Sequence, residues 1–511
     1  MPDPTRVTYG SDDLPARHVA AALAGAGYEL RPFVRTERTL LDTFDGRLHA
    51  AGLRLEVARE GEKLVLTVTD GGPAPAVMVV DRVPATAGDL PPGPLRARLA
   101  PALDVRALLP VMTLSSMHAT ALRRNESGKA VAAVDIHDEL VLGTGQRLSV
   151  PWSAEVVPYE GYDKAARQAG ALLTSIGLRA LDGDLFQVAA KEAGVDLRGF
   201  QDRAWVPLDP SEPAAGGYRR VLANLAATAG ANWQGTVDDV DSEFLHDFRI
   251  AVRRSRSILS HAKGVLPSDG RRHFGAELKW LGAATSPLRD ADVYLIEWPG
   301  YVAPLDAESS AALEPLLAHI SARRAAEHAT LVDELRSPRY QRLITEWAAW
   351  LEDSEAPAKG QRPLGTVVAA RIRDAQEQVL ARGRPITPAT PAEELHELRK
   401  DAKRLRYLLE CFGGLLPASH RKPFVQRLKA LQDNLGEHQD TEVHTAQLKT
   451  MSQELHEAGV GAGTLVAMGR LTEIFEHRRL QAREEFAARF TAYDTKQTAR
   501  VLDELLEAAR P

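Results

Sequence analysis

The chain has 511 residues, of which 44% are hydrophobic and 26% are charged, and its formal net charge is −6. This length exceeds what one hydrophobic core supports, so we expect two or more domains of ordinary globular composition. A net negative charge argues against attraction of polyanions by the whole surface, so any anion site must be a local concentration of cations. The one cysteine, Cys411, excludes an intramolecular disulfide and suits a reducing compartment.

Residues 1–14 contain neither a basic segment nor an apolar run, and the sequence shows no stretch of the roughly 20 apolar residues that a membrane span requires. We therefore expect a cytoplasmic protein with no membrane partner.

The first part of the chain, residues 1–200, is predicted to form an α+β domain. Short segments with period-two alternation predict an antiparallel barrel or tunnel of about eight strands. These segments include residues 53–57, 63–68, 77–83 and 130–136. Helical patterns occur at residues 14–26, 93–108, 162–176 and 184–193.

A linker at residues 201–212, which contains Pro207 and Pro210, precedes a predicted all-α domain at residues 213–511. Three-to-four spacing of apolar residues predicts two pseudo-symmetric helical bundles there. The predicted helices are 222–232, 240–265, 271–284, 307–335, 340–352, 367–381, 392–415, 421–435, 440–458, 464–490 and 497–508.

An internal repeat lies within this helical part. Residues 246–267, HDFRIAVRRSRSILSHAKGVLP, align without a gap with residues 396–417, HELRKDAKRLRYLLECFGGLLP. Two copies of one segment predict two matching half-domains.

Each copy places a basic stripe beside an apolar stripe. At 100° per residue, the cations of each copy fall within about 80° of one another on a helix. The stripe consists of His246, Arg249, Arg253 and Arg256 in the first copy, and of His396, Arg399, Lys403 and Arg406 in the second. Residues 246–279 hold eight Lys or Arg against three Asp or Glu, and residues 396–429 hold nine against three, so the acids needed for pairing within the stripes are mostly absent.

Two interpretations remain open for these stripes. They are either solvated helix faces or a site at which an external anion neutralises mutually repelling cations. Arginine favours phosphate because its planar fork bonds two oxygens, and histidine near phosphate can take up a proton. Nucleic acid usually adds aromatic platforms for bases, but Phe248, Phe274 and Phe424 fall on the apolar phase, which favours a chain of phosphates.

The repeated pattern resembles the CHAD family, the conserved-histidine α-helical domain, over about residues 213–508. The resemblance implies binding of inorganic polyphosphate on a basic central surface. By motif position, the implied binding residues are His246, Arg249, Arg253, Arg254, Arg256, Lys279, His396, Arg399, Lys403, Arg404, Arg406 and Lys429, with Arg271, Arg272, Arg421 and Lys422 in matching turns.

Residues 39–68 are similar to the CYTH family, the triphosphate tunnel fold, through Leu41-Asp42-Thr43, Gly52 to Arg54, and Leu66-Thr67. Active members open with an E-x-E-x-K strand that holds a divalent metal, whereas this chain has Thr5-Arg6-Val7-Thr8-Tyr9. The resemblance implies a vestigial set of tunnel-facing charges without a metal site: Arg38, Arg54, Glu56, Lys63, Arg123, Asp135 and Glu155.

The sequence therefore predicts a polyphosphate-binding protein without a cofactor, in which the first domain is a non-catalytic partner. Polyphosphate granules are a candidate location within the cytoplasm. One alternative is a triphosphatase or related phosphohydrolase that uses Mg²⁺ or Mn²⁺ in the tunnel, and another is a scaffold whose basic face docks an acidic protein. The sequence does not specify the oligomeric state.

Overall fold

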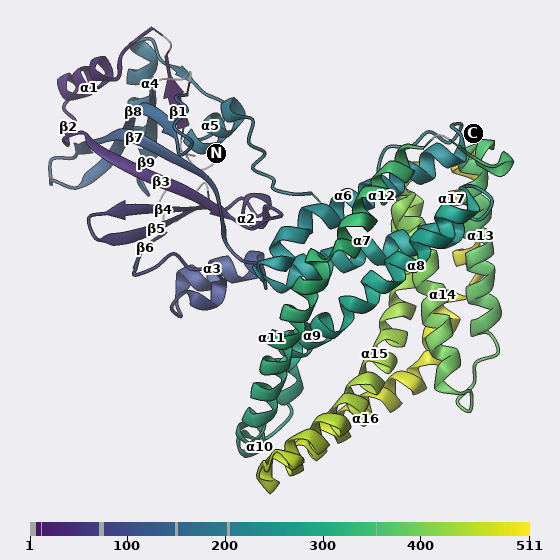
Figure 1. Cartoon of the computed structure of the whole chain (residues 1–511). Helices are drawn as coiled ribbons and strands as arrows, with labels where there is room; N and C mark the ends of the chain where they lie inside the picture. The colour runs from purple at the N-terminus through teal and green to yellow at the C-terminus, as the bar shows by residue number, and fades with distance from the viewer. Residues whose placement is uncertain are drawn as a thin grey trace. The chain divides into compact units, whose positions relative to one another are not determined.

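The computed structural model describes residues 7–11, 13–70, 76–148, 152–201, 205–353 and 355–510. The chain divides into two compact units, Met1–Asp202 and Arg203–Pro511 (Figure 1). The first unit contains all the named strands, and every named element of the second is a helix. The predicted fold classes, α+β followed by all-α, are confirmed.

The first unit is built on one antiparallel sheet of ten strands, in the order β10-β1-β9-β8-β7-β3-β4-β5-β6, with β2 paired to β7. Among the described residues the sheet is open rather than closed into a barrel. The strands are β1 (Val7–Gly10), β2 (Glu29–Leu30), β3 (Val34–Asp42), β4 (Arg54–Glu60), β5 (Lys63–Thr69), β6 (Ala76–Val80), β7 (Leu109–Arg124), β8 (Ala130–Leu142), β9 (Trp152–Pro158) and β10 (Arg179–Ala180).

The two faces of this sheet are covered differently. Val134 and Ile136 of β8 pack in one core with helices α1 (Ala16–Gly25) and α4 (Asp163–Ser175). Their neighbours Asp135 and His137 point to the opposite face, because successive side chains of a strand alternate. We call this second face the inner face.

Helix α5 (Leu185–Ala193) covers part of the inner face. Its residues Leu185 and Phe186 share a core with Leu40 of β3 and Met112 of β7. The remaining helices of the unit are short, namely α2 (Arg47–Ala50), η1 (Ala87–Asp89) and α3 (Pro94–Leu103).

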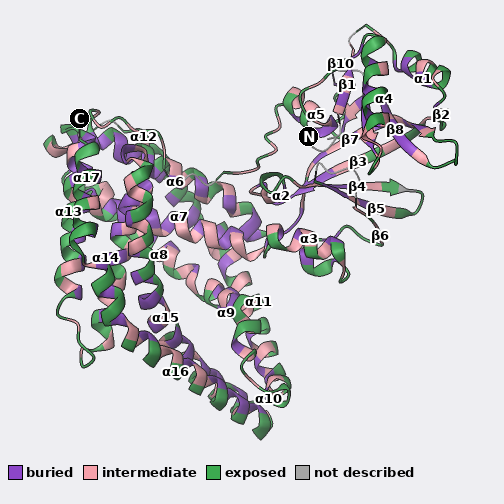
Figure 2. Cartoon of the chain, turned by 180° about the vertical axis from the view of Figure 1, so that it is seen from behind, coloured by how far each residue is buried: buried purple, intermediate pink, exposed green. Residues whose placement is uncertain are grey.

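The second unit consists of long helices whose buried residues face one another along their lengths (Figure 2). They are α6 (Ala214–Val237), α7 (Ser242–His261), α8 (Ser268–Ala284), α9 (Ser286–Val302), α10 (Ala307–Ala312), α11 (Glu314–Arg336), α12 (Pro338–Glu352), α13 (Leu364–Gly383), α14 (Ala392–Cys411), α15 (Ala418–Glu457), α16 (Ala462–Tyr493) and α17 (Lys496–Ala508), with 3-10 turns η2 (Ala358–Gln361) and η3 (Gly413–Leu415). None of the described helices is long and apolar enough to cross a membrane.

Three helix predictions differ from the structure in this unit. The predicted helix 307–335 is divided at Leu313 into α10 and α11. The predicted helices 421–435 and 440–458 form one helix of 40 residues, α15, because Gly436 is tolerated within it and no proline interrupts that part. Helix α9 was not predicted, since Pro299 and Gly300 lie within it. In the first copy the chain instead breaks between α8 and α9 at Thr285, just before Pro287.

The two copies of the repeat are joined by a reciprocal pair of backbone hydrogen bonds. The Ala214 N–H donates to the Arg362 carbonyl at 2.9 Å, and the Leu364 N–H donates to the Glu212 carbonyl at 2.8 Å. Ala214 precedes Leu364 by 150 residues, and Glu212 precedes Arg362 by the same number. This is the spacing of the sequence repeat, so each hydrogen bond maps onto the other. The repeat thus extends back to the starts of α6 and α13, and the halves are related by a pseudo-two-fold axis.

Candidate functional site

A groove of about 630 Å³ lies between α7 and α14, the helices that carry the repeated segment, with α8 along its edge. Seven cations and one carboxylate, that of Glu397, contribute to its walls. The cations are Arg253, Arg256, Arg271, Arg272, Lys400, Lys403 and Arg404. The structure therefore brings basic residues of both copies to one groove.

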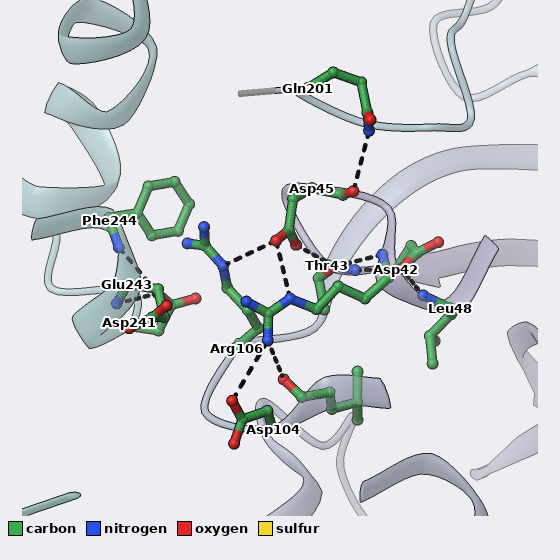
Figure 3. Close-up of polar contacts among 12 residues, drawn as sticks. Asp42, Thr43, Asp45, Leu48, Asp104, Arg106, Gln201, Asp241, Glu243 and Phe244 are labelled. Carbon is green, nitrogen blue, oxygen red and sulfur yellow. Dashed lines mark hydrogen bonds and ion pairs between the residues drawn. The ribbon is translucent and has the colours of Figure 1, made fainter. Parts of the chain in front are cut away.

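The N-terminal cap of α7 and the burial of its apolar face determine the side of the helix on which its cations lie. The Asp241 carboxylate caps the helix by accepting the backbone N–H groups of Glu243 and Phe244 at 2.9 and 3.2 Å (Figure 3). Phe248 and Val252 are buried in the core of the unit. Burial of this apolar stripe leaves the basic stripe for the groove side of the helix.

Arg253 and Lys403 occupy equivalent positions of the two copies, and both are half-buried in the groove. Burial, and then the charge of Arg253, lowers the pKa of Lys403 to about 7, with Arg399 adding to the effect. Among the described residues, neither Arg253 nor Lys403 has a carboxylate within ion-pair distance. These two equivalent cations therefore lie together in the groove, and the Asp440 carboxylate, which bonds Arg399, offsets their charge only in part.

Other cations of the second copy do have internal partners. Arg399 bonds Asp440 at 2.9 Å, Arg404 bonds Asp401 at 2.9 Å, Arg406 bonds Glu410 at 2.5 Å, and Lys429 lies 3.6 Å from Asp433. The expectation that pairing acids are mostly absent is therefore wrong for this copy. Two of these acids, Asp433 and Asp440, lie beyond residues 396–429, and Asp440 reaches Arg399 only because α15 packs against α14.

Arg254 lies outside the groove. Its guanidinium bonds the Glu410 carboxylate of the other copy at 3.0 Å, and the two side chains are only 10% and 14% exposed. The equivalent residue Arg404 is 45% exposed and lines the groove. Arg254 thus joins the two copies, whereas Arg404 lines the groove while it bonds Asp401.

The other predicted residues of the helical unit do not line the groove. Arg249 donates to Thr285 Oγ1 at 2.7 Å and Ser286 Oγ at 3.1 Å, at the break between α8 and α9. The Nδ1 atom of His396 lies 2.5 Å from Gln439 Oε1. The rest are half-buried His246 and Arg421 and exposed Lys279, Lys422 and Lys429.

The inner face of the first unit gathers charges of both signs around Arg54. Arg54 lies 2.7 Å from Glu56, 2.7 Å from Asp184 and 3.9 Å from Glu155, and Arg38 lies 3.2 Å from Glu56. These ion pairs neutralise both arginines within the chain, so the face does not present an excess of positive charge.

Histidines extend this network toward Asp135. His118 lies 3.3 Å from the Asp135 carboxylate, and His137 lies 3.3 Å from the Arg38 guanidinium. Burial, and then the nearby Arg38, lowers the pKa of His137 well below its ordinary value. His137 is therefore a neutral member of the inner face.

Two predicted tunnel residues lie elsewhere. Arg123 is on the face opposite to the inner face. Ala121, two residues before it on β7, packs with α1 and α4, and the Arg123 guanidinium lies 5.6 Å from the centre of the Tyr28 ring. The predicted assignment of Arg123 to the tunnel is wrong, because residues two apart on β7 share one face of the sheet. Lys63 shares the face of Arg54 but is exposed at the far end of β5.

The inner face does not fit a divalent metal. Its carboxylates from Glu56, Glu155 and Asp184 converge on Arg54, and the described residues contain no group of three or more metal-binding side chains. The residues Thr5 and Arg6 of the first motif lie outside the described residues, while Val7–Gly10 form β1.

Asp42, which belongs to the motif that suggested the tunnel fold, has a structural role. Its carboxylate accepts the backbone N–H groups of Thr43, Leu48 and His49 at 2.6, 2.8 and 2.9 Å and so holds the turn before α2 (Figure 3). The following Asp45 accepts a hydrogen bond from Thr43 at 2.7 Å.

Sequence reasoning missed four residues of these two surfaces. Lys400 and Tyr407 line the groove, and Asp184 and His137 belong to the inner face. Asp184 had a readable signal, because its carboxylate caps α5 through an Asp-x-x-Gln pattern. His137 follows Asp135 by two positions and so shares its face.

Residues 220–449 match the CHAD domain family, so the second unit contains a CHAD domain, as the repeat predicted. The chain is 24% identical over 316 residues to uncharacterised proteins of two Mycobacterium tuberculosis strains. The match covers 60% of this chain, which spans 58% of the length of those curated relatives.

One solved structure is similar to the second unit, and another is similar to the first unit. The CHAD domain of the plant Ricinus communis is 24% identical, with a TM-score of 0.45, over 60% of this chain and 96% of that one. An adenylyl cyclase candidate from Hippeastrum, described as having a dominant triphosphatase activity, is 15% identical, with a TM-score of 0.27, over 38% of this chain and 99% of that one.

Proposed function

We propose that this protein binds inorganic polyphosphate in the groove between α7 and α14. The observation that carries the proposal is the composition of the groove walls, which hold seven cations and one carboxylate in a chain whose net charge is −6. Such a local excess of positive charge attracts a polyanion, and the polyanion neutralises cations that otherwise repel one another.

The residue types suit phosphate. Five of the seven cations are arginines, whose planar fork bonds two phosphate oxygens at once and stays charged at any physiological pH. Burial, and then its cationic neighbours, lower the pKa of Lys403 to about 7, so this lysine is partly uncharged near neutral pH. A bound phosphate would favour the charged form of Lys403. Ligand binding would therefore raise the positive charge of the groove.

The walls favour a chain of phosphates over nucleic acid. Tyr407 is the one aromatic side chain that lines the groove among the described residues. Single-stranded nucleic acids usually stack successive bases on several aromatic rings. A polymer without bases needs only the cations that the groove supplies.

Equilibrium titration with fluorescently labelled long-chain polyphosphate would test this proposal. We expect salt-sensitive binding that weakens by about tenfold or more when Arg253→Ala is combined with Lys403→Ala. A matched control, Lys449→Ala with Arg500→Ala, removes two exposed cations of the same unit outside the groove and should bind like wild type.

Competition would separate the alternatives. Unlabelled polyphosphate should displace the probe at lower concentration than single-stranded nucleic acid or an acidic peptide of equal charge. Preferential displacement by the acidic peptide would instead indicate a scaffold for an acidic protein. In this proposal the first unit is a non-catalytic partner.

A further inference from the structure

Between residues 246–283 and 396–433, five positions are acidic in only one copy. Two of these acids, Asp269 and Glu277, belong to the first copy and pair with Arg272 and Arg339. The second copy has Asp401, Glu410 and Asp433, where the first copy has Ala251, Ser260 and Ala283. All three acids form ion pairs, with Arg404, Arg406 and Lys429 respectively. The folds of the copies are thus equivalent, but their charges are not.

The equivalents of these paired cations in the first copy are not neutralised in the same way. Arg256 and Lys279 correspond to Arg406 and Lys429, and both are exposed. No carboxylate lies within ion-pair distance of either one in the part of the chain that the structure describes. Ser260 and Ala283 replace the acids four residues further along the helix, which is the spacing at which a helical ion pair forms.

The surroundings of Arg256 also lack the neutral partner that Arg406 has. Arg406 donates to Gln432 Oε1 at 3.4 Å, whereas the equivalent of Gln432 is Gly282. A Cβ atom at Gly282 would lie 3.3 Å from Arg256 Nη1, so the guanidinium lies over the bare backbone of α8. The donors of Arg256 therefore remain available to a ligand.

Glu410 cannot easily release Arg406. Its other oxygen accepts a hydrogen bond from the largely buried Arg254 at 3.0 Å. A phosphate that drew Glu410 away would leave the charge of Arg254 buried without a partner, which is strongly unfavourable. The second copy therefore retains its carboxylate, and with it the neutralised state of Arg406.

We propose that the polyanion is bound asymmetrically, on the first-copy side of the groove. This inference rests on the proposed function and assigns its main contacts to Arg253, Arg256 and Arg271, with Lys403 as the contribution of the second copy. Arg406 and Lys429 are structural cations held by the chain's own carboxylates.

Helix α8 extends this path beyond the groove. Arg271 and Gly275 line the groove, and Lys279 follows Gly275 by four residues on the same side of the helix. Eight residues, or about 12 Å of helix, separate Arg271 from Lys279. A linear polyanion that leaves the groove along α8 therefore meets a further cation, which favours long chains over short ones.

Paired alanine variants would test the asymmetry, with long-chain polyphosphate as the ligand. We expect Arg256→Ala and Lys279→Ala each to weaken binding by about fivefold, as for the loss of one charge-assisted contact, and Arg406→Ala and Lys429→Ala to change it by less than about twofold. Thermal unfolding of each variant reports whether the fold is retained.

A reciprocal exchange supplies a second readout that keeps the helices intact. Ser260→Glu and Ala283→Asp introduce the second-copy acids at exposed positions of the first copy, and each should weaken binding. Equal losses for Arg256→Ala and Arg406→Ala, with wild-type binding preserved, would overturn the asymmetry alone. Absence of binding by the wild-type chain would overturn the proposed function as well.

Discussion

Arg253 and Lys403 are equivalent residues of the two copies, and they lie close enough together in the groove for the arginine to affect the lysine's protonation. Burial, and then Arg253, lowers the pKa of Lys403 from its ordinary 10.5 to about 7. A pseudo-symmetric fold places equivalent side chains together at its axis, and here both are cations. Their mutual repulsion is the physical reason to expect an external anion between them.

The lowered pKa predicts a pH dependence of polyphosphate binding. Because an anion favours the charged lysine, binding takes up a proton, and affinity should fall as pH rises through about 7 and above. Lys403→Arg stays charged, so its affinity should change less between about pH 6 and 9. Titrations at constant salt would measure both profiles, and an identical pH dependence for the two proteins would contradict the assignment.

The same shift has an opposite consequence for stability. A lysine whose pKa is lowered by folding destabilises the folded state when it is protonated. This penalty is complete below about pH 7 and is lost as pH rises toward the unfolded value near 10.5. Lys403→Met should therefore raise the unfolding temperature more at pH 6 than at pH 9. An equal rise at both pH values would argue against a lowered pKa.

The buried pair of Arg254 and Glu410 predicts a large loss of stability. Glu410→Ala should cost about 3–5 kcal/mol, because it leaves the charge of Arg254 buried without its partner. Combining it with Arg254→Met should restore most of the loss. Tryptophan fluorescence during denaturation reports this, since six of the seven tryptophans lie in the second unit.

A matched surface pair provides the control for this prediction. Glu504 bonds Arg500 at 2.9 Å, and the two side chains are 41% and 80% exposed. Glu504→Ala should therefore cost less than about 1 kcal/mol. Similar losses for Glu410→Ala and Glu504→Ala would mean that the cross-repeat pair does not hold the copies together.

Asp42 predicts a stability effect in the first unit. Asp42→Ala removes the acceptor of three backbone N–H groups and should cost about 2–3 kcal/mol, while Asp42→Asn should cost less. Trp152, the one tryptophan of this unit, is buried and would report the transition. Glu29→Ala is a control, because that side chain is 62% exposed and bonds Arg124 at 3.0 Å. An equal loss for Glu29→Ala would contradict the role given to Asp42.

The sequence predicted the groove better than the inner face, for a physical reason. The repeat supplied a register, so one helical stripe could be checked against its copy, and Arg253 and Lys403 were found in this way. Arg123 lies outside the repeat, so no second copy could show which face of the sheet it occupies. Its face depends on whether it is an odd or an even residue along β7. The ion pair of Arg254 with Glu410 joins residues 156 positions apart and depends on packing that periodicity does not encode.

The charges around Arg54 predict that the first unit does not hydrolyse triphosphate. Both Glu56 and Asp184 bond this arginine at 2.7 Å and compete with a phosphate for it. We expect no release of phosphate from tripolyphosphate above background with Mg²⁺ or Mn²⁺. Metal-dependent release that is lost on Arg54→Ala would contradict this and assign catalysis to the inner face.

The salt dependence of polyphosphate affinity tests the central proposal most directly. The dissociation constant of the wild-type chain should rise steeply with salt, as expected when bound phosphates release their counterions. The Arg253→Ala, Lys403→Ala variant should bind more weakly, and its slope of log affinity against log salt should be shallower by about 0.7 per lost contact. The Lys449→Ala, Arg500→Ala control should keep the wild-type slope. Equal slopes and affinities for all three proteins would show that the groove is not the polyphosphate site.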